Sequence, residues 1–296
     1  MPSFVTHHYF AVRVRRAAPP AIACLCENAP AAYAWGSQGP DPFFFYPSTL
    51  SRLGGRMHRS GIAETFRAMA DAAGESPAAL AYLLGFCTHY ALDRTVHPYI
   101  EDQTRRLSVN YRLSGSAAHK LCETDLDSAV LLRLGKAVPA SEPAYRLLDT
   151  EAPECREAAR LLSAAGNAAG GAVTAGQAKD ALRCMYQVYR FLHRSRAGRR
   201  LLPMGEAALH QPGALSSMFR RNTLLPEDSP NRAHRIWLDW EGRPHTEDFR
   251  TLMERDALPF ALVLQRAACA ACRRGNPFPE GMFSMDYSGR RFGGAE

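Results

Sequence analysis

Most of the chain alternates between apolar and polar positions with the period of an α-helix. Over residues 62–73, for example, Ile62, Phe66 and Met69 recur at three- and four-residue intervals, which places them on one helical face. The strict two-residue alternation of a β-strand is nearly absent, so the pattern predicts an all-α fold. The same spacing predicts further helices over residues 116–134, 155–165, 178–195 and 247–273.

The longest predicted helix begins at Ser76 and Pro77, because serine is a favoured helix cap and proline is favoured in the first turn. Apolar residues continue from there to about His97, where the following Pro98 disfavours further helix. Within this helix Gly85 has no side chain, so we expect another segment of the chain to approach closely at this position.

The second half of the chain carries a weaker pattern. Residues 199–245 are rich in Pro and Arg and are predicted to form long loops with short helical pieces. Pro259 is expected to bend the helix over residues 247–273. Neither an internal repeat nor a low-complexity linker divides the sequence, so we predict one bundle-like helical domain over residues 1–296.

Composition narrows the class of protein. The chain has 296 residues, of which 46% are hydrophobic and 22% charged, as in an ordinary globular protein that can bury a core. No apolar run reaches the roughly 18 to 20 residues that a membrane-spanning helix needs. The first residues lack the basic and apolar segments of a secretory signal. These observations predict a cytoplasmic protein with neither a signal peptide nor a transmembrane segment.

The formal net charge is +7, and only three of the 36 basic residues are lysines. The arginines are dispersed, and no cluster reaches the length of a basic tract that binds nucleic acid, so the charge gives mild support for an anionic substrate. The eight cysteines are expected to be reduced thiols in a chain without a signal peptide. Motifs of serine hydrolases, P-loop proteins and dinucleotide-binding folds are absent.

Three polar residues interrupt the apolar surface of the longest predicted helix. His89, Asp93 and His97 are each four residues apart. Because four residues advance an α-helix by about 400°, the offset from one to the next is roughly 40°, and the three side chains form one stripe. The stripe offers two imidazoles and one carboxylate to a common volume, and these are ligands that zinc prefers.

The next predicted helix repeats this spacing, since His119 and Glu123 are also four residues apart and Asp127 extends the stripe. Facing helices that each carry a histidine and a carboxylate commonly build metal sites in helical bundles. A network of hydrogen bonds is the alternative, because polar groups buried without any partner cost several kcal/mol each. Two helices with this spacing favour the metal site.

Two further segments supply candidate side chains. Asp41 lies between two prolines in a segment that we expect to be a rigid loop, with four aromatic residues at 43–46. It either presents its carboxylate to the site or caps a helix, which is a frequent role of aspartate before proline. His58 follows a pair of glycines, predicted as a turn, and precedes a helix.

At the start of the chain, Thr6 is a candidate helix cap, and His7 and His8 are either exposed or a further source of ligands.

Taken together, these motifs resemble the zinc-dependent phospholipase C family, whose secreted members share a helical fold with single-strand-specific zinc nucleases. The motifs occur in the order of that family within residues 1–130, whereas residues after about 135 show only helical composition. In sequence order they are Thr6-His7, Gly39-Pro40-Asp41, Met57-His58, His89-x3-Asp93-x3-His97-Pro98 and His119-x3-Glu123.

The resemblance implies two or three zinc ions. Two sets of ligands follow from it: His58, His89 and Asp93 for one ion, and His97, His119 and Glu123 for a second. Asp93 would bridge to a third ion that His7 helps to bind, with His8 as the alternative to His7. Secreted relatives complete that third site with their N-terminal amine, a role that the amine of Pro2 takes here if Met1 is removed.

The resemblance also implies an activity. Zinc ions that lie close together lower the pKa of bound water and polarise phosphoryl oxygens, which suits hydrolysis of phosphate esters. Asp41 would be a zinc ligand or the group that orients the attacking water. The expected substrate is a phosphate-ester small molecule or a phospholipid head group. A zinc-dependent nuclease acting on single-stranded nucleic acid and a non-catalytic zinc-stabilised helical module are the alternatives.

Overall fold

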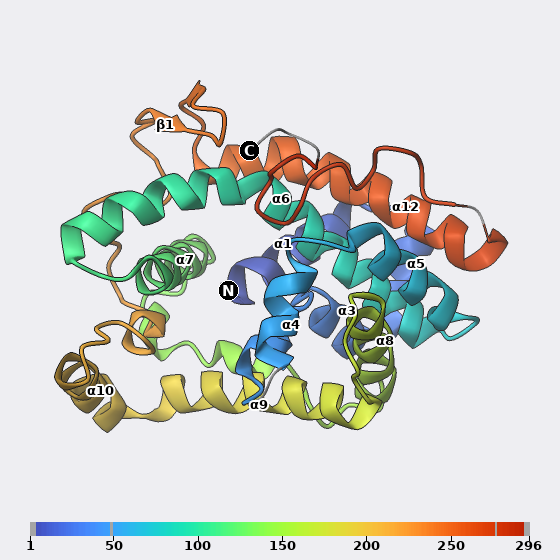
Figure 1. The fold of residues 1–296 in the computed structure, drawn as a ribbon, viewed down its shortest axis with the longest axis horizontal. Coiled ribbons are helices and arrows are strands. Elements are labelled where there is room, and N and C mark those ends of the chain that lie inside the picture. The colour runs from blue at the N-terminus through green and yellow to red at the C-terminus, as the bar shows by residue number, and fades with distance from the viewer. Residues whose placement is uncertain (1–3, 48–49, 276, 293–296) are drawn as a thin grey trace.

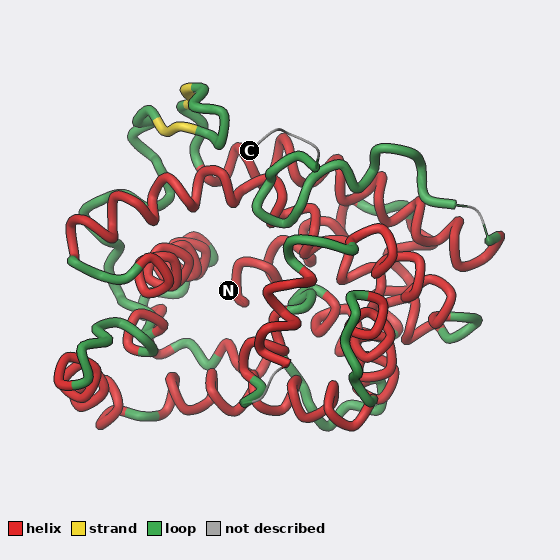
Figure 2. The backbone as a smooth tube through the Cα atoms, viewed as in Figure 1, coloured by secondary structure: helices red, strands yellow, loops and turns green. Residues whose placement is uncertain are grey.

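The computed structural model describes residues 4–47, 50–275 and 277–292. Its longer helices, shown in Figures 1 and 2, are α1 (Phe4–Ala17), α2 (Pro20–Asn28), α3 (Pro30–Gly36), α4 (Leu50–Met57), α5 (Ile62–Ala73), α6 (Pro77–Tyr111), α7 (Gly115–Arg133), α8 (Cys155–Ala168), α9 (Ala175–Arg194), α10 (Arg196–Ala208) and α12 (Leu258–Arg274). This content confirms the predicted all-α fold.

Short elements connect these helices. The 3-10 helices are η1 (Asp41–Phe45), η2 (Pro139–Ser141), η3 (Ala144–Leu147) and η4 (Ser216–Met218). A three-residue helix, α11 (Phe249–Thr251), leads into a π-helical stretch, η5 (Leu252–Ala257), just before α12. Strands β1 (Trp237–Leu238) and β2 (Pro244–His245) form the small antiparallel hairpin that projects at the top of Figure 2.

Helix α6 is the central element, and it packs against α3, α7 and α12 (Figure 1). Its first half lies in one cluster of buried apolar residues and its second half in another. The change from one cluster to the other occurs between Tyr90 and Ala91, beside the stripe that starts at His89. The polar stripe therefore lies where the two hydrophobic cores meet.

The prediction that this helix ends near His97 is wrong, because α6 continues through Pro98 to Tyr111. Proline inside a helix removes only one backbone hydrogen bond, and its effect is a local disturbance when the flanking turns are well packed. Here Tyr99 and Leu107 are both almost fully buried, so apolar burial extends the helix past the proline.

The C-terminal region is more helical than its composition indicates. Helix α10, 13 residues long with Pro203 inside it, covers residues 199–208 of the stretch for which long loops with short helical pieces are predicted. The helix predicted over residues 247–273 is present as α11, η5 and α12. Pro259 lies at the start of α12, where its missing N–H would have no helical partner anyway. The irregular part of this region is the π-helical stretch before α12, and Pro259 itself lies in the first turn of the helix that follows.

Gly85 brings α3 against α6, as its lack of a side chain predicts. A Cβ atom on Gly85 would lie only 2.3 Å from the carbonyl oxygen of Tyr33 in α3. After α3 the chain turns at Gly39, which has a φ of +53° and faces the ring of His89 so closely that a Cβ would lie 2.2 Å from it. Only glycine fits both constraints, so this turn delivers Asp41 beside His89.

None of the helices in the described part of the chain is long and apolar enough to cross a lipid bilayer.

Candidate metal centre

Asp93 lies at the centre of the polar side chains between the helices. One carboxylate oxygen, Oδ1, is 3.3 Å from Nε2 of His7 and 3.4 Å from Nε2 of His97. The other, Oδ2, is 3.2 Å from Nε2 of His89 and 3.8 Å from Nε2 of His58. Four imidazoles, from α1, from α6 and from the turn after α4, therefore face one buried carboxylate.

All eight side chains proposed from the sequence belong to compact groups of ligand atoms. Within each group the atoms lie within 4.8 Å of one another, and one group, His7, Asp41 and His89, contains the aspartate from the turn after α3. The other two groups are His58 with His89 and Asp93, and His97 with His119 and Glu123. These last two coincide with the two ligand sets that the family resemblance implies.

The orientation of α1 determines that His7, and not His8, faces the cluster. His7 is buried and contacts Asp93, whereas His8 belongs to none of the three groups formed by the described residues. Burial and, to a smaller extent, Arg15 lower the pKa of His8 to about 4. The amine of Pro2 lies outside the described residues.

Unpaired buried atoms show that the cluster fits a metal. Among the described residues, Nε2 of His58, Nε2 of His89 and Oδ1 of Asp41 are buried without a hydrogen-bond partner. Nδ1 of His58 is 2.7 Å from the carbonyl oxygen of Gly54, and Nδ1 of His89 is 3.2 Å from that of Ser37. A carbonyl accepts only from a protonated Nδ1, so the lone pair of Nε2 points into the cluster. Imidazole nitrogens and carboxylate oxygens are a suitable donor set for zinc.

Electrostatics hold the carboxylates in their charged form. Burial raises the pKa of Asp93, but His97, His89 and His7 overcome this effect and hold it well below the usual value. Burial also raises the pKa of Asp41, and His89 and His58 again lower it.

Burial lowers the pKa of His89 despite the neighbouring Asp93, so this imidazole is held in its neutral form. A charged carboxylate and a neutral imidazole are the forms that bind metals.

Comparison with known families shows to which family the chain belongs. The family model for zinc-dependent phospholipase C matches residues 6–164, which is more than half of the chain and includes every proposed ligand. The chain belongs to the zinc-dependent phospholipase C family. No curated protein and no solved structure matches it.

One residue of this family member's site was missed by the sequence reasoning. Glu101 in α6 places Oε1 at 3.1 Å from Nδ1 of His119, while Nε2 of His119 is 3.2 Å from Oε1 of Glu123. Burial lowers the pKa of His119, but Glu123 and Glu101 outweigh it and raise the pKa to about 9. Glu101 follows His97 by four residues, so the spacing that revealed the stripe could have found it.

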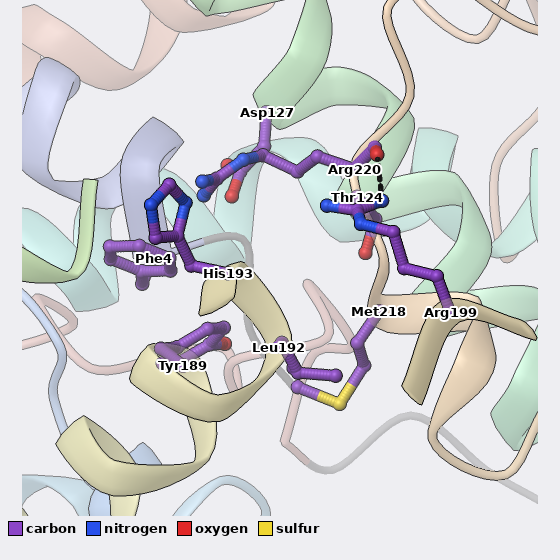
Figure 3. A pocket seen from close by; sticks show the side chains of 9 residues that line it. All are labelled: Phe4, Thr124, Asp127, Tyr189, Leu192, His193, Arg199, Met218 and Arg220. Carbon is purple, nitrogen blue, oxygen red and sulfur yellow. Dashed lines mark hydrogen bonds between the residues drawn. The ribbon is translucent and has the colours of Figure 1, made fainter. Parts of the chain in front are cut away.

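Asp127, the third polar residue of the α7 stripe, does not join the cluster. It accepts hydrogen bonds from the backbone N–H groups of Val5 and Thr6, the latter at 2.8 Å, and from the Thr6 hydroxyl. It thereby accepts hydrogen bonds from free N–H groups at the start of α1 and fixes the position of this helix, which carries His7. Figure 3 shows Asp127 with the guanidinium of Arg220 extending toward it.

Thr6 is therefore not the helix cap, because it lies inside α1 and donates to Asp127. The expected turn before His58 is also wrong, since Gly54 and Gly55 lie within α4 and His58 follows its last residue. A Cβ on Gly54 would lie 3.3 Å from the ring of Phe44, so the small size of glycine lets this ring pack tightly against α4. The alternative in which Asp41 caps a helix does not apply, because η1 begins at Asp41 and has no side-chain cap.

The aromatic run after Asp41 divides between core and site. Phe43 is fully buried in the hydrophobic core. The ring of Phe44 lies 5.3 Å from that of His58 and lines a cavity of about 330 Å³. Glu101 and His119 line the same cavity, so it gives access to the cluster from the α7 side.

Proposed function

We propose that this protein is a zinc-dependent hydrolase of phosphate esters. The observation that carries the proposal is the proximity of the three ligand groups, because two of them share His89 and Asp93 also contacts His97 of the third. A structural zinc site is closed by four ligands around one ion, whereas overlapping sites favour several ions close together. When bound, such ions lower the pKa of water and polarise phosphoryl oxygens, as phosphate-ester hydrolysis requires.

In this proposal Asp93 and its four histidines hold the ions together with His119 and Glu123. The protein orients these ligands through groups outside the cluster, such as the carbonyl that fixes each Nδ1–H and the carboxylate of Glu101. Such outer contacts hold the ligand rings at the angle that binding needs.

Asp41 is the residue to which we assign the orientation of the attacking water. Its Oδ1 atom is 3.2 Å from Nε2 of His58 and 4.0 Å from Nε2 of His89, at the edge of the cluster. The low pKa of Asp41, to which His89 contributes against the effect of burial, keeps the carboxylate free to accept a hydrogen bond. Direct ligation of zinc by Asp41 is the alternative role.

Substrate access supports hydrolysis over a purely structural role. The side chains of His58 and His119 are 13% and 15% exposed, whereas those of His89 and Asp93 are 0% and 4% exposed. The cluster is therefore sealed on the α6 side and reachable beside Phe44, where the 330 Å³ cavity lies. We expect a phosphate-ester small molecule or a phospholipid head group to enter there.

The first test measures zinc content by elemental analysis and hydrolysis of bis(p-nitrophenyl) phosphate by the zinc-loaded protein. We expect more than one zinc ion per chain, and a His89→Ala variant that loses both zinc and hydrolysis. His234→Ala is the matched control, because His234 is exposed and lies outside the three groups. Zinc bound as a single ion, with no hydrolysis of this or other phosphate esters, would identify a structural module.

A second variant separates the two roles of Asp41. Asp41→Asn should retain the zinc content of the wild type and lose about a hundredfold or more in turnover if the carboxylate orients water. Loss of zinc in this variant would make Asp41 a ligand, and full activity would remove it from the mechanism.

A further inference from the structure

A second cavity continues from the one beside the cluster. The cavity next to His119 and a larger one of about 760 Å³ share two lining residues, Ser116 and Lys120. The larger cavity lies between the start of α7 and the chain around residues 207–214. Together they form a groove that leads from the cluster over the first turns of α7, and we call it the α7 groove.

The lining of the larger cavity carries basic side chains, and the nearby carboxylate of Glu206, whose charge acts on Lys120, accepts hydrogen bonds from backbone N–H groups within residues 213–216. Arg112, Lys120 and His210 line the larger cavity, and none of its described lining residues is an aspartate or glutamate. No carboxylate of the described residues lies within 4.0 Å of the side-chain nitrogens of Arg112 or Lys120. By contrast, Arg243 and Arg250 elsewhere on the surface are each paired with a carboxylate.

Lys120 is positioned rather than freely extended. Its Nζ donates a hydrogen bond of 2.7 Å to the carbonyl oxygen of Ala214, which leaves its other N–H groups available to a ligand. Lys120 directly follows His119, whose Nε2 reaches Glu123 in the cluster. Ser116, which both cavities share, precedes His119 by three residues, or roughly 5 Å along the helix.

The start of α7 leaves space for an anion. A Cβ on Gly115 would meet no atom within 4 Å, and Ser116 is exposed. Ser114 caps only the N–H of Ala117, and the free N–H groups of a helix start favour negative charge. These features reinforce the charge of Arg112 and Lys120, which are the main recognition elements.

We propose that the α7 groove binds a second phosphate of the substrate, one that is not cleaved. The preferred substrates would then be phosphate diesters that carry an additional phosphate group, with the scissile ester at the cluster and the other phosphate at Lys120 and Arg112. The inference rests on the proposed function for the position of the scissile ester.

The test compares two synthetic diesters that differ by one phosphate. Thymidine 5′-(p-nitrophenyl phosphate) has only the scissile group, and its 3′-phosphorylated derivative carries the second anion. For the zinc-loaded protein we expect kcat/KM to be at least about tenfold higher for the 3′-phosphorylated compound, because charge-assisted hydrogen bonds to phosphate are strong. Arg112→Gln and Lys120→Gln should each bring this ratio toward one, and Lys120→Arg should restore it.

A control variant that loses the same two positive charges elsewhere on the surface tests whether net charge alone changes the ratio. The double variant Arg156→Gln with Lys179→Gln alters exposed residues on α8 and α9, away from the α7 groove. It should keep the wild-type ratio of kcat/KM for the two diesters, whereas Arg112→Gln with Lys120→Gln should not. Equal kcat/KM for both diesters in the wild type would overturn the second phosphate site and leave the proposed hydrolysis intact.

If neither diester is hydrolysed, that result counts against the proposed function. A binding measurement then tests the phosphate site by itself. Equilibrium dialysis with thymidine 3′,5′-bisphosphate should then show binding that weakens about tenfold in the double Arg112 and Lys120 variant and not in the control. Unchanged binding in all three proteins, or no binding, would overturn the α7 groove as a phosphate site.

Discussion

Helices α6 and α7 carry the same pattern with different outcomes. Each has a glycine, a histidine, a carboxylate and a further polar residue at four-residue intervals. The two sets are Gly85, His89, Asp93 and His97 on α6, and Gly115, His119, Glu123 and Asp127 on α7.

On α6 all three polar side chains enter the cluster, and Gly85 is sealed against α3. On α7 only the first two enter it, because Asp127 binds the start of α1, while Gly115 borders open space. Although the spacing is identical, α6 is covered by α3 at its glycine, whereas α7 is open to solvent at its glycine. Spacing determines which side chains share a face, and the neighbouring elements determine what that face contacts.

The largest difference between the two stripes is expected in zinc content, when an aspartate of each stripe is replaced by asparagine. Asp93→Asn removes the carboxylate that four imidazoles share, so we expect loss of most bound zinc and at least about a thousandfold loss of hydrolysis. Asp127→Asn retains an oxygen that accepts from Thr6 and should keep the zinc content. Elemental analysis of both variants checks this, and equal zinc loss would show that the stripes act alike.

The glycines give the next largest contrast, in stability. Gly85→Ala would force a Cβ to 2.3 Å from a backbone oxygen, and we expect a loss of about 3 kcal/mol in the free energy of unfolding. Gly115→Ala has nothing within 4 Å to meet and should be neutral or slightly stabilising. Urea denaturation of both variants measures the difference. A Gly85→Ala protein as stable as the wild type would refute the close approach of α3.

Asp127 should make stability depend on pH. Burial raises its pKa to about 6 from the model-peptide value of 3.8, so the folded state holds the proton more tightly than the unfolded state does. Its contribution is therefore present below about pH 4 and is lost as the pH rises to about 6, by up to about 3 kcal/mol. Asp127→Asn should lack this loss, which unfolding curves at pH 4 and pH 7 would reveal as a difference from the wild type.

The smallest effect is expected at Glu101, which acts on the open side of the site through His119. Glu101→Ala removes the acceptor for Nδ1–H of His119, and we expect about a tenfold loss in zinc affinity at the α7 ligands. Glu101→Gln retains an acceptor and should recover part of it. Competition with a zinc-binding dye gives the affinities. Identical affinity in all three proteins would mean that Glu101 does not orient His119.

Much of the site was predictable because it obeys local rules. Four-residue spacing gave the correct faces of α6 and α7, and the absence of a side chain at Gly85 correctly predicted the close approach of α3. Glu101 obeys the same spacing and was missed only because the helix was expected to end at Pro98. That error arose because a local rule for proline does not include the burial of Tyr99 and Leu107 beyond it.

Other features had no local signal. Nothing in the adjacent pair His7 and His8 indicates which ring faces inward, because the rotation of α1 depends on its packing against α6 and α7. The role of Asp127 is equally hidden, since its partners Val5 and Thr6 are more than a hundred residues away in the sequence.

The sequence alone therefore determined the helical class, the family resemblance and the candidate donor atoms, which depend on residue type and on local spacing. Only the tertiary structure decided that Asp93 is the common centre, that Glu101 contacts His119 while Asp127 binds the start of α1, and that basic side chains line a groove beside the cluster. The physical reason is that helical geometry repeats every few residues, whereas contacts between helices depend on how distant segments pack.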